Sequence, residues 1–317
     1  MADRNHHHQP AWIVPLLMAL LVLFGTTNVI TGKIRSEPLG EYSGFVTSIL
    51  SQAVYFTTYW AIFGMKFALG KVPREQWEWV WHRRGGVSDT GQTWWAKLPG
   101  WKYTFLSSIA DVLGDNLMFL TQAYLSIVVF NLLQQGMVPF TLLWSMILLG
   151  SRYILEEVLG VGLVVTMAVA SVFVSTHGDG PAGILMATLC LLSTTFQALG
   201  FVVKEAMFRD YAEFAKERGL SPKLDVFAVC SSNHLWGILW VLPVSYMVEW
   251  ARNGGDVIAE MREGFETLWF ADHALFAFLI YIVINILFNI TIYLLVSYGS
   301  SLLTFLAPHR GVYGEFV

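Results

Sequence analysis

Two acidic residues inside an apolar stretch are the strongest chemical signal in this sequence. Asp111 and Asp115 lie four residues apart between Lys102 and Ala123, so they share one face of a helix. Inserting a carboxylate near the centre of a membrane-spanning helix costs about 2.5–3.5 kcal/mol of free energy. The presence of two carboxylates therefore requires a structural or functional explanation. Because neighbouring carboxylates in a low dielectric cannot both ionise cheaply, we expect them to share a proton and to bind a cationic solute or a coupling proton. The alternative is that they only hydrogen-bond to a neighbouring helix.

Three side-chain amides follow in the next apolar stretch, residues 124–150. Asn131 lies three residues before Gln134 and four before Gln135, so we expect these amides to line the same cavity as the acids. Hydrogen bonds between helices would explain them equally well. We expect Pro139 to kink this helix, because proline removes one backbone donor.

A histidine in a later apolar stretch could respond to pH. His234 follows Asn233, and an unperturbed histidine titrates near neutral pH, so His234 is a candidate pH sensor. The alternative is a structural histidine whose ring is satisfied by the carbonyl of a neighbouring residue.

The composition is that of a membrane protein. The chain is 55% hydrophobic and 13% charged, whereas soluble domains carry about 25% charged residues. The net charge of −4 and the lack of a basic block argue against a nucleic-acid partner. We find no phosphate-binding Gly-rich loop, no G-x-S-x-G, no H-E-x-x-H and no C-x-x-C, so we expect neither an enzyme nor a cofactor or metal site.

The hydrophobic pattern predicts an all-α integral membrane protein with eight complete spans and a truncated ninth. Each complete span is a mostly apolar stretch of about 20 residues. They cover residues 12–31, 42–69, 102–123, 124–150, 157–176, 182–204, 224–247 and 273–297. The ninth begins at Tyr298 and stops near Ala307.

The segments between the spans indicate how the chain sits in a membrane. Residues 70–101, rich in tryptophan and basic residues, and the amphipathic stretch 257–269 are expected to lie along the membrane surface. Most of the 19 Lys and Arg residues fall on the side of the N-terminus, which predicts a cytosolic N-terminus. No transit-peptide pattern precedes Trp12, so we expect a vacuolar or other endomembrane rather than a plastid envelope.

A weak internal repeat divides this single membrane domain of residues 1–317 into two halves. A shift of 174 residues places Asp111 on Asn285 and Asp115 on Asn289, so both halves carry a polar pair in matching helices. This pattern predicts inverted halves over residues 11–176, with five helices, and 182–317, with three helices and a stub. We therefore expect a truncated ten-helix protein whose spans three and eight face each other, with an intended eight-helix protein as the alternative.

The third to fifth spans resemble the chloroquine-resistance-transporter-like family of the drug/metabolite transporter superfamily. The matching features are Asp111, the Gln134–Gln135 pair with Pro139, the Gly-Ser-Arg-Tyr sequence at 150–153 and the Leu-Gly pair at 159–160. The resemblance extends more weakly to about Leu306. It implies a ten-helix inverted repeat with cytosolic termini and transport of amino acids, small peptides, glutathione-like thiols or cationic drugs.

We therefore expect a multi-pass secondary transporter of small solutes, with the lipid bilayer, a small-molecule substrate and protons as partners. Asn285 and Asn289 join the predicted binding residues through the repeat. A nucleotide-sugar or organophosphate carrier of the same superfamily is one alternative, but it needs basic residues facing the cavity where the spans offer acids. A non-transporting truncated membrane protein is the other.

Overall fold

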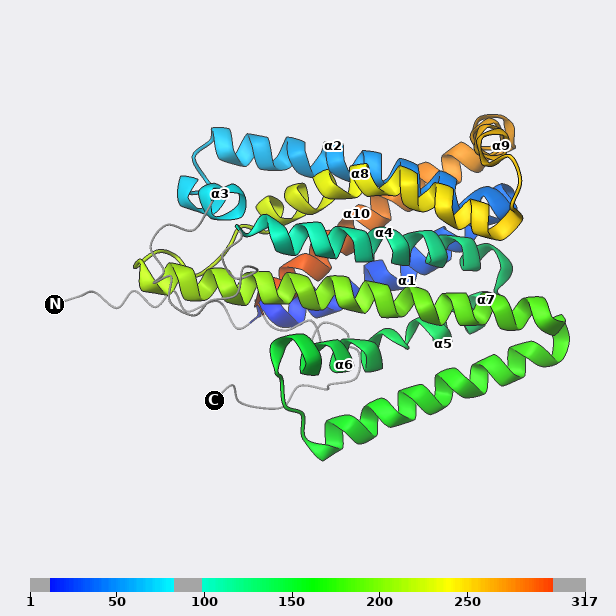
Figure 1. Ribbon diagram of the computed structural model, residues 1–317, viewed down its shortest axis with the longest axis horizontal. Helices are drawn as coiled ribbons and strands as arrows, with labels where there is room; N and C mark the ends of the chain where they lie inside the picture. The colour runs from blue at the N-terminus through cyan, green and yellow to red at the C-terminus, as the bar shows by residue number, and fades with distance from the viewer. Residues whose placement is uncertain (1–11, 83–98, 299–317) are drawn as a thin grey trace.

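The computed structural model describes residues 12–82 and 99–298, and within these ranges the chain is helical and contains no strand. The long helices run side by side along the longest axis of the molecule (Figure 1). In chain order the elements are α1 (Ile13–Leu39), η1 (Gly40–Tyr42), α2 (Ser43–Ala68), α3 (Arg74–Trp81), α4 (Trp101–Tyr124), α5 (Ile127–Gln134), α6 (Met137–Leu149), α7 (Leu155–Glu217), α8 (Val226–Asn253), α9 (Val257–Phe270) and α10 (Ala274–Tyr298). The predicted ninth span lies outside the described residues.

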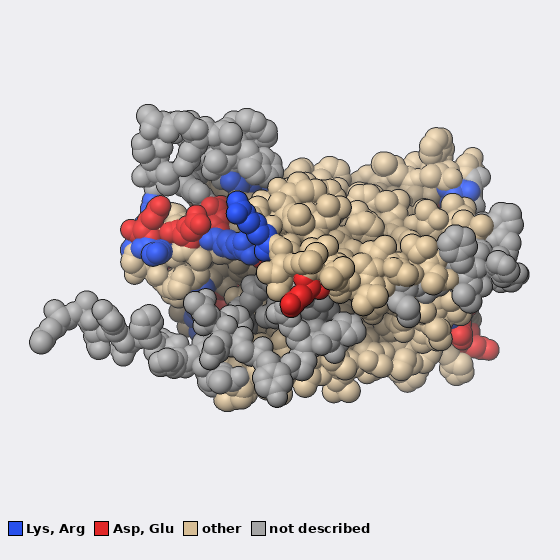
Figure 2. Space-filling view, turned by 90° about the horizontal axis from the view of Figure 1, so that it is seen from below, with Lys and Arg blue, Asp and Glu red and all other residues tan. Residues whose placement is uncertain are grey.

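Five helical stretches of the described chain are long and apolar enough to cross a membrane. They are Ile13–Ala68, Ile127–Leu149, Gly183–Glu217, Val226–Arg252 and Ala274–Ser297. Charged side chains gather towards the left end of one face, and a wide stretch without charge separates them from the few at the right (Figure 2). The prediction of an all-α integral membrane protein is therefore confirmed. The predicted third span is the helix α4, but its buried polar side chains keep it out of this apolar set.

The predicted fourth span is two helices. α5 ends at Gln134 and α6 begins at Met137, so the helix is interrupted at Gln135 and Gly136. Pro139 lies in the first turn of α6, where a missing backbone donor costs little. The predicted kink at Pro139 is thus wrong in position, because the break precedes the proline.

The predicted fifth and sixth spans belong to one continuous helix of 63 residues, α7. Its ribbon turns sharply at one end of the molecule and returns (Figure 1). The returning arm, residues 183–217, packs against α4, α5 and α6. This arm therefore supplies one wall of the interior.

Helix α1 continues beyond its predicted end at residue 31 to Leu39. Tertiary contacts satisfy one charged side chain of this extra length, Lys33. Lys33 Nζ donates to the carbonyl oxygens of Gln122, Ala123 and Leu125, each at 3.1 Å, which caps the end of α4. A prediction from apolar residues alone ends the helix too early, because Lys33, a charged residue of this segment, is held by contacts with another helix.

The two short amphipathic helices α3 and α9 lie at opposite ends of the bundle (Figure 1). α3 is not merely a membrane-surface helix as predicted, because Trp79 and Val80 are buried against α7 and α8. In α9, Leu268 is buried and Trp269 is exposed, as expected for an amphipathic helix at a boundary. The remainder of the predicted surface segment, residues 83–98, lies outside the described chain.

Three pairs of long helices form the interior: α1 packs on α10, α2 on α8, and α4 on the returning arm of α7. The last contact is close because glycines leave room for it. A Cβ atom added to Gly114 would lie 2.6 Å from Gln197 Cγ and 3.1 Å from the Ser193 carbonyl oxygen. Gly114 therefore lets α4 approach the backbone of α7.

We predict that Gly114→Val destabilises the protein by about 1–3 kcal/mol, because the added methyl groups overpack the contact between α4 and α7. Thermal unfolding in detergent micelles measures the effect. Gly160→Val is the matched control, because nothing lies within 4 Å of a Cβ atom at Gly160. Equal melting temperatures for the two variants would contradict this account of the packing.

Candidate solute-binding cavity

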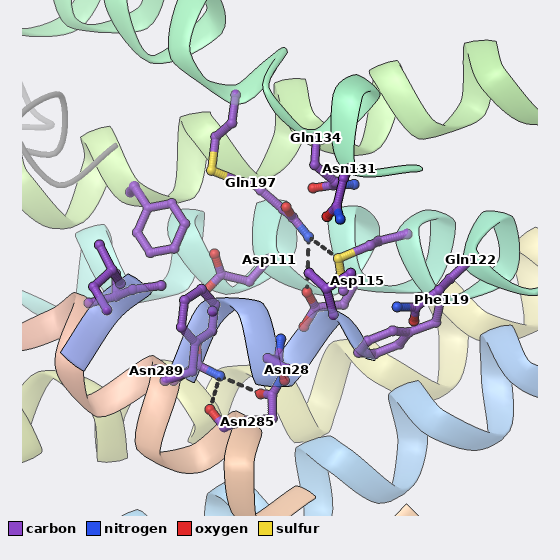
Figure 3. A pocket seen from close by; sticks show the side chains of 18 of the residues that line it. Asn28, Asp111, Asp115, Phe119, Gln122, Asn131, Gln134, Gln197, Asn285 and Asn289 are labelled. Atoms are coloured by element: carbon purple, nitrogen blue, oxygen red, sulfur yellow. Dashed lines mark hydrogen bonds between the residues drawn. The ribbon is translucent and has the colours of Figure 1, made fainter. Parts of the chain in front are cut away.

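A cavity of about 550 Å³ lies at the centre of the bundle, between α1, α2, α4, α5, α6, α7, α8 and α10. Polar side chains from several of these helices point into the same space (Figure 3). All eight residues predicted from sequence for binding or pH sensing line it: Asp111, Asp115, Asn131, Gln134, Gln135, His234, Asn285 and Asn289. The structure brings these residues together, and their binding role stays a prediction.

Asp111 is held by a cation at the last position of the predicted span 182–204, Lys204. Lys204 Nζ lies 2.6 Å from Asp111 Oδ2, and the Lys204 side chain is 2% exposed. Asn233 Nδ2 donates a second hydrogen bond of 2.8 Å to the same oxygen. Lys204 also lies over the rings of Phe201 and Tyr293. Asp111 is therefore compensated by a buried counter-charge, so it does not need to share a proton with Asp115.

Asp115 has a different environment from Asp111. Its Oδ1 accepts a long hydrogen bond of 3.4 Å from Gln197 Nε2 (Figure 3). Among the described residues, no Lys or Arg nitrogen lies within 4 Å of the Asp115 carboxylate. Asp115 is thus the cavity acid that a cationic group or a proton would neutralise.

The amides of the broken helix divide into one that is engaged and two that are open to the cavity. Gln134 Nε2 lies 3.5 Å from Cys190 Sγ. The side chains of Asn131 and Gln135 are exposed, and no hydrogen bond holds them within the described part of the chain. These two amides are therefore available to a solute.

Asn285 and Asn289, in contrast, belong to a satisfied network. Asn285 Nδ2 donates to Asn28 Oδ1 and to the Tyr281 hydroxyl, both at 2.8 Å. Asn285 Oδ1 accepts from the Tyr55 hydroxyl and from Asn289. A group with its donors and acceptors already paired inside the protein favours structure over binding.

His234 is also held on several sides. Its Nδ1 lies 2.8 Å from Gln52 Oε1, and its ring stacks on Tyr59 and tilts against Tyr55, each at 5.0 Å between centroids. The neutral amide partner and the aromatic packing favour a structural histidine over the predicted pH sensor.

Four important residues were missed from sequence, and helical spacing could have found three of them. Gln122 lies seven residues after Asp115, and Lys204 lies seven after Gln197, so each pair shares a helix face. Arg35 has no comparable signal. Arg35 falls between the predicted spans 12–31 and 42–69, yet it is fully buried in α1 beside the rings of Phe119 and Tyr281.

We predict that Lys204→Ala costs about 3 kcal/mol of stability, because it leaves the Asp111 carboxylate buried without its counter-charge. This value is at the lower end of the range for breaking a buried ion pair, because the Asp111 side chain is 14% exposed. Combining Lys204→Ala with Asp111→Asn should recover much of the loss. Thermal unfolding of both variants measures this, with the exposed Arg262→Ala as control. A double variant no more stable than the single one would contradict the pairing.

Comparison with known proteins identifies relatives of the whole chain. Three proteins of Arabidopsis thaliana match: "Protein CLT3, chloroplastic", 27% identical over 96% of this chain; "Protein CLT1, chloroplastic", 25% over 93%; and "Protein CLT2, chloroplastic", 22% over 90%. The chain spans 64%, 63% and 63% of the lengths of these relatives.

A match to a family profile assigns the chain to a protein family. The profile described as "CRT-like, chloroquine-resistance transporter-like" matches residues 89–273. The match covers more than half of the 317 residues and includes the acids of α4, the broken helix and the returning arm of α7. This protein belongs to the chloroquine-resistance-transporter-like family.

Proposed function

We propose that the protein is a secondary transporter that moves small polar solutes across an intracellular membrane through the central cavity. The observation that carries this proposal is a cavity lined by polar side chains, whose walls are helices apolar enough to span a bilayer together with the more polar α4. Ionisable residues inside a membrane protein commonly mark the pathway of a substrate or ion. The family membership supports the same reading.

The charges around the cavity favour neutral or zwitterionic solutes. Asp111 and Asp115 carry two negative charges. Lys204 in the cavity wall and Arg35, which lies behind the wall residue Phe119, carry two positive charges, so the formal sum is zero. The free amides of Asn131 and Gln135 suit the polar groups of amino acids, small peptides or glutathione-like thiols. An organophosphate carrier needs an excess of positive charge, so the balanced set argues against that alternative.

We also propose that protons drive transport and that Asp115 carries the coupling proton. Asp115 lines the cavity and has no Lys or Arg nitrogen within 4 Å among the described residues, whereas Asp111 is paired with Lys204. A proton and a cationic group of the solute would then compete for one carboxylate, which couples their binding.

The two-halves organisation remains a proposal, with residues 11–176 and 182–317 as inverted repeats. Its support is the order of the elements. The series α1, α2, α3, α4 is two long helices, a short one and a long one, and residues 183–217 with α8, α9 and α10 follow the same order. The packing of α1 on α10 and of α4 on the returning arm of α7 relates the halves reciprocally.

We propose a plastid membrane as the membrane in which the protein resides. The Arabidopsis relatives are named chloroplastic, which favours a plastid membrane over the vacuolar or other endomembrane expected from sequence.

We predict that Asp115→Asn lowers solute uptake at least about tenfold and flattens its dependence on pH, because an amide cannot exchange the coupling proton. Uptake of radiolabelled glutathione, lysine and tetraethylammonium into proteoliposomes at two pH values measures this. Asp272→Asn is the control, because Asp272 is exposed outside the cavity. Unchanged uptake in both Asp111→Asn and Asp115→Asn would end the proposal, and no uptake by the unmodified chain would favour a non-transporting protein.

A further inference from the structure

Arg35 is a buried cation whose hydrogen-bonding capacity is largely unused. Its side chain is 0% exposed. The guanidinium carbon lies 4.7 Å from the centroid of the Phe119 ring and 4.3 Å from that of Tyr281. The two rings lie edge to face with each other, with their centroids 6.1 Å apart, so they contact the guanidinium group from adjacent sides. Aromatic contacts of this kind stabilise a buried arginine but use none of its N–H donors.

One edge has a single partner, and that partner is uncharged. Arg35 Nη2 donates to Gln122 Oε1 at 2.8 Å, while Nε and Nη1 have no hydrogen-bond partner. No carboxylate of the described residues lies within 4 Å of the guanidinium group. Two other cations of the described chain differ, because the buried Lys204 pairs with Asp111 and the partly buried Arg252 pairs with Glu249. A buried arginine without an acid is unusual, since its desolvation is normally offset by a pair.

The position of Arg35 connects it to the cavity. Phe119, Gln122 and Tyr281, the three side chains that surround it, all line the cavity wall. Gln122 therefore stands between the solute space and the guanidinium group. It is seated against α1 at Gly32, where an added Cβ atom would lie 2.5 Å from Gln122 Nε2.

We propose that Arg35 is a carboxylate-binding subsite of the cavity, and that Gln122 occupies it when no ligand is bound. A ligand carboxylate replaces the Gln122 amide oxygen and accepts from Nη2 and Nε, which lie on the same edge of the guanidinium plane. This two-pronged contact is the geometry that arginine and carboxylate prefer. The inference rests on the proposed function, because the ligand is the transported solute.

The spacing along α4 limits the size of the ligand. Asp115 and Gln122 are seven residues apart, which places them about 10 Å apart along the helix. A solute with its ammonium group near Asp115 and its carboxylate at Arg35 therefore falls between an amino acid and a tripeptide in length. A carboxylate-free cation would use only the Asp115 end.

Ligand affinity tests this subsite separately from transport. The probes are glutathione and glutathione diethyl ester, which lacks free carboxylates, and thermal shift of the full chain in detergent micelles gives each affinity. We expect the unmodified protein to prefer glutathione about tenfold or more, the scale of one lost charge-assisted contact. Arg35→Gln should remove that preference and Arg35→Lys should retain part of it. The exposed Arg262→Gln is the matched control and should keep the preference.

Gln122→Glu provides a second variant that does not depend on truncating Arg35. Its own carboxylate would fill the guanidinium edge, so the melting temperature should rise and glutathione binding should weaken. The subsite is overturned if the unmodified protein shows no preference for glutathione, or if Arg35→Gln or Gln122→Glu keeps it. If the protein takes up solute but shows no preference for glutathione, the subsite is wrong and the transport function still holds. If the protein shows a preference that depends on Arg35 but takes up no solute, the subsite holds and the transport function is wrong.

Discussion

The structure depends on compensating charge inside an apolar bundle. Lys204 and Asp111 come from α7 and α4, and their contact joins the two helices at the depth of the cavity. Neither charge would be tolerated alone at this depth, because burying an unpaired ion costs several kcal/mol. Gly114 and Gly200 allow the two helices to lie close enough for the pair to form. The charged interior of the bundle is therefore stable only while α4 and α7 remain packed together.

The cavity combines satisfied and unsatisfied polar groups, and this division indicates where a solute would act. Asn285 and His234 are paired with neighbouring side chains on α1, α2 and α10, so they stiffen one wall. Asp115, Asn131 and Gln135 have few or no protein partners. A binding site needs such free groups, since a group already paired gains little from a ligand. Asn131, on α5 just before the helix break, lies across the cavity from Asn285 (Figure 3).

Two cations that lie at or beyond the ends of predicted spans are buried in the structure. Lys204 and Arg35 follow apolar stretches, so their positions resemble helix ends near a membrane surface, where basic residues are common. In the structure both are buried and covered by aromatic rings, Lys204 by Phe201 and Tyr293, Arg35 by Phe119 and Tyr281. Aromatic faces and long side-chain stems let a cation lie deep in a bundle without direct contact with water.

Sequence by itself determined the membrane class, the limits of α2, α4 and α10, and the helix face that carries Asp111 and Asp115. These features follow from apolar length and from helical periodicity, which are local properties of the chain. Only the tertiary structure decided which polar groups meet. The partners of Asp111 lie 93 and 122 residues away, and Arg35 meets Gln122 across 87 residues. Such contacts depend on how helices pack against one another, and no local pattern in a single sequence encodes that choice.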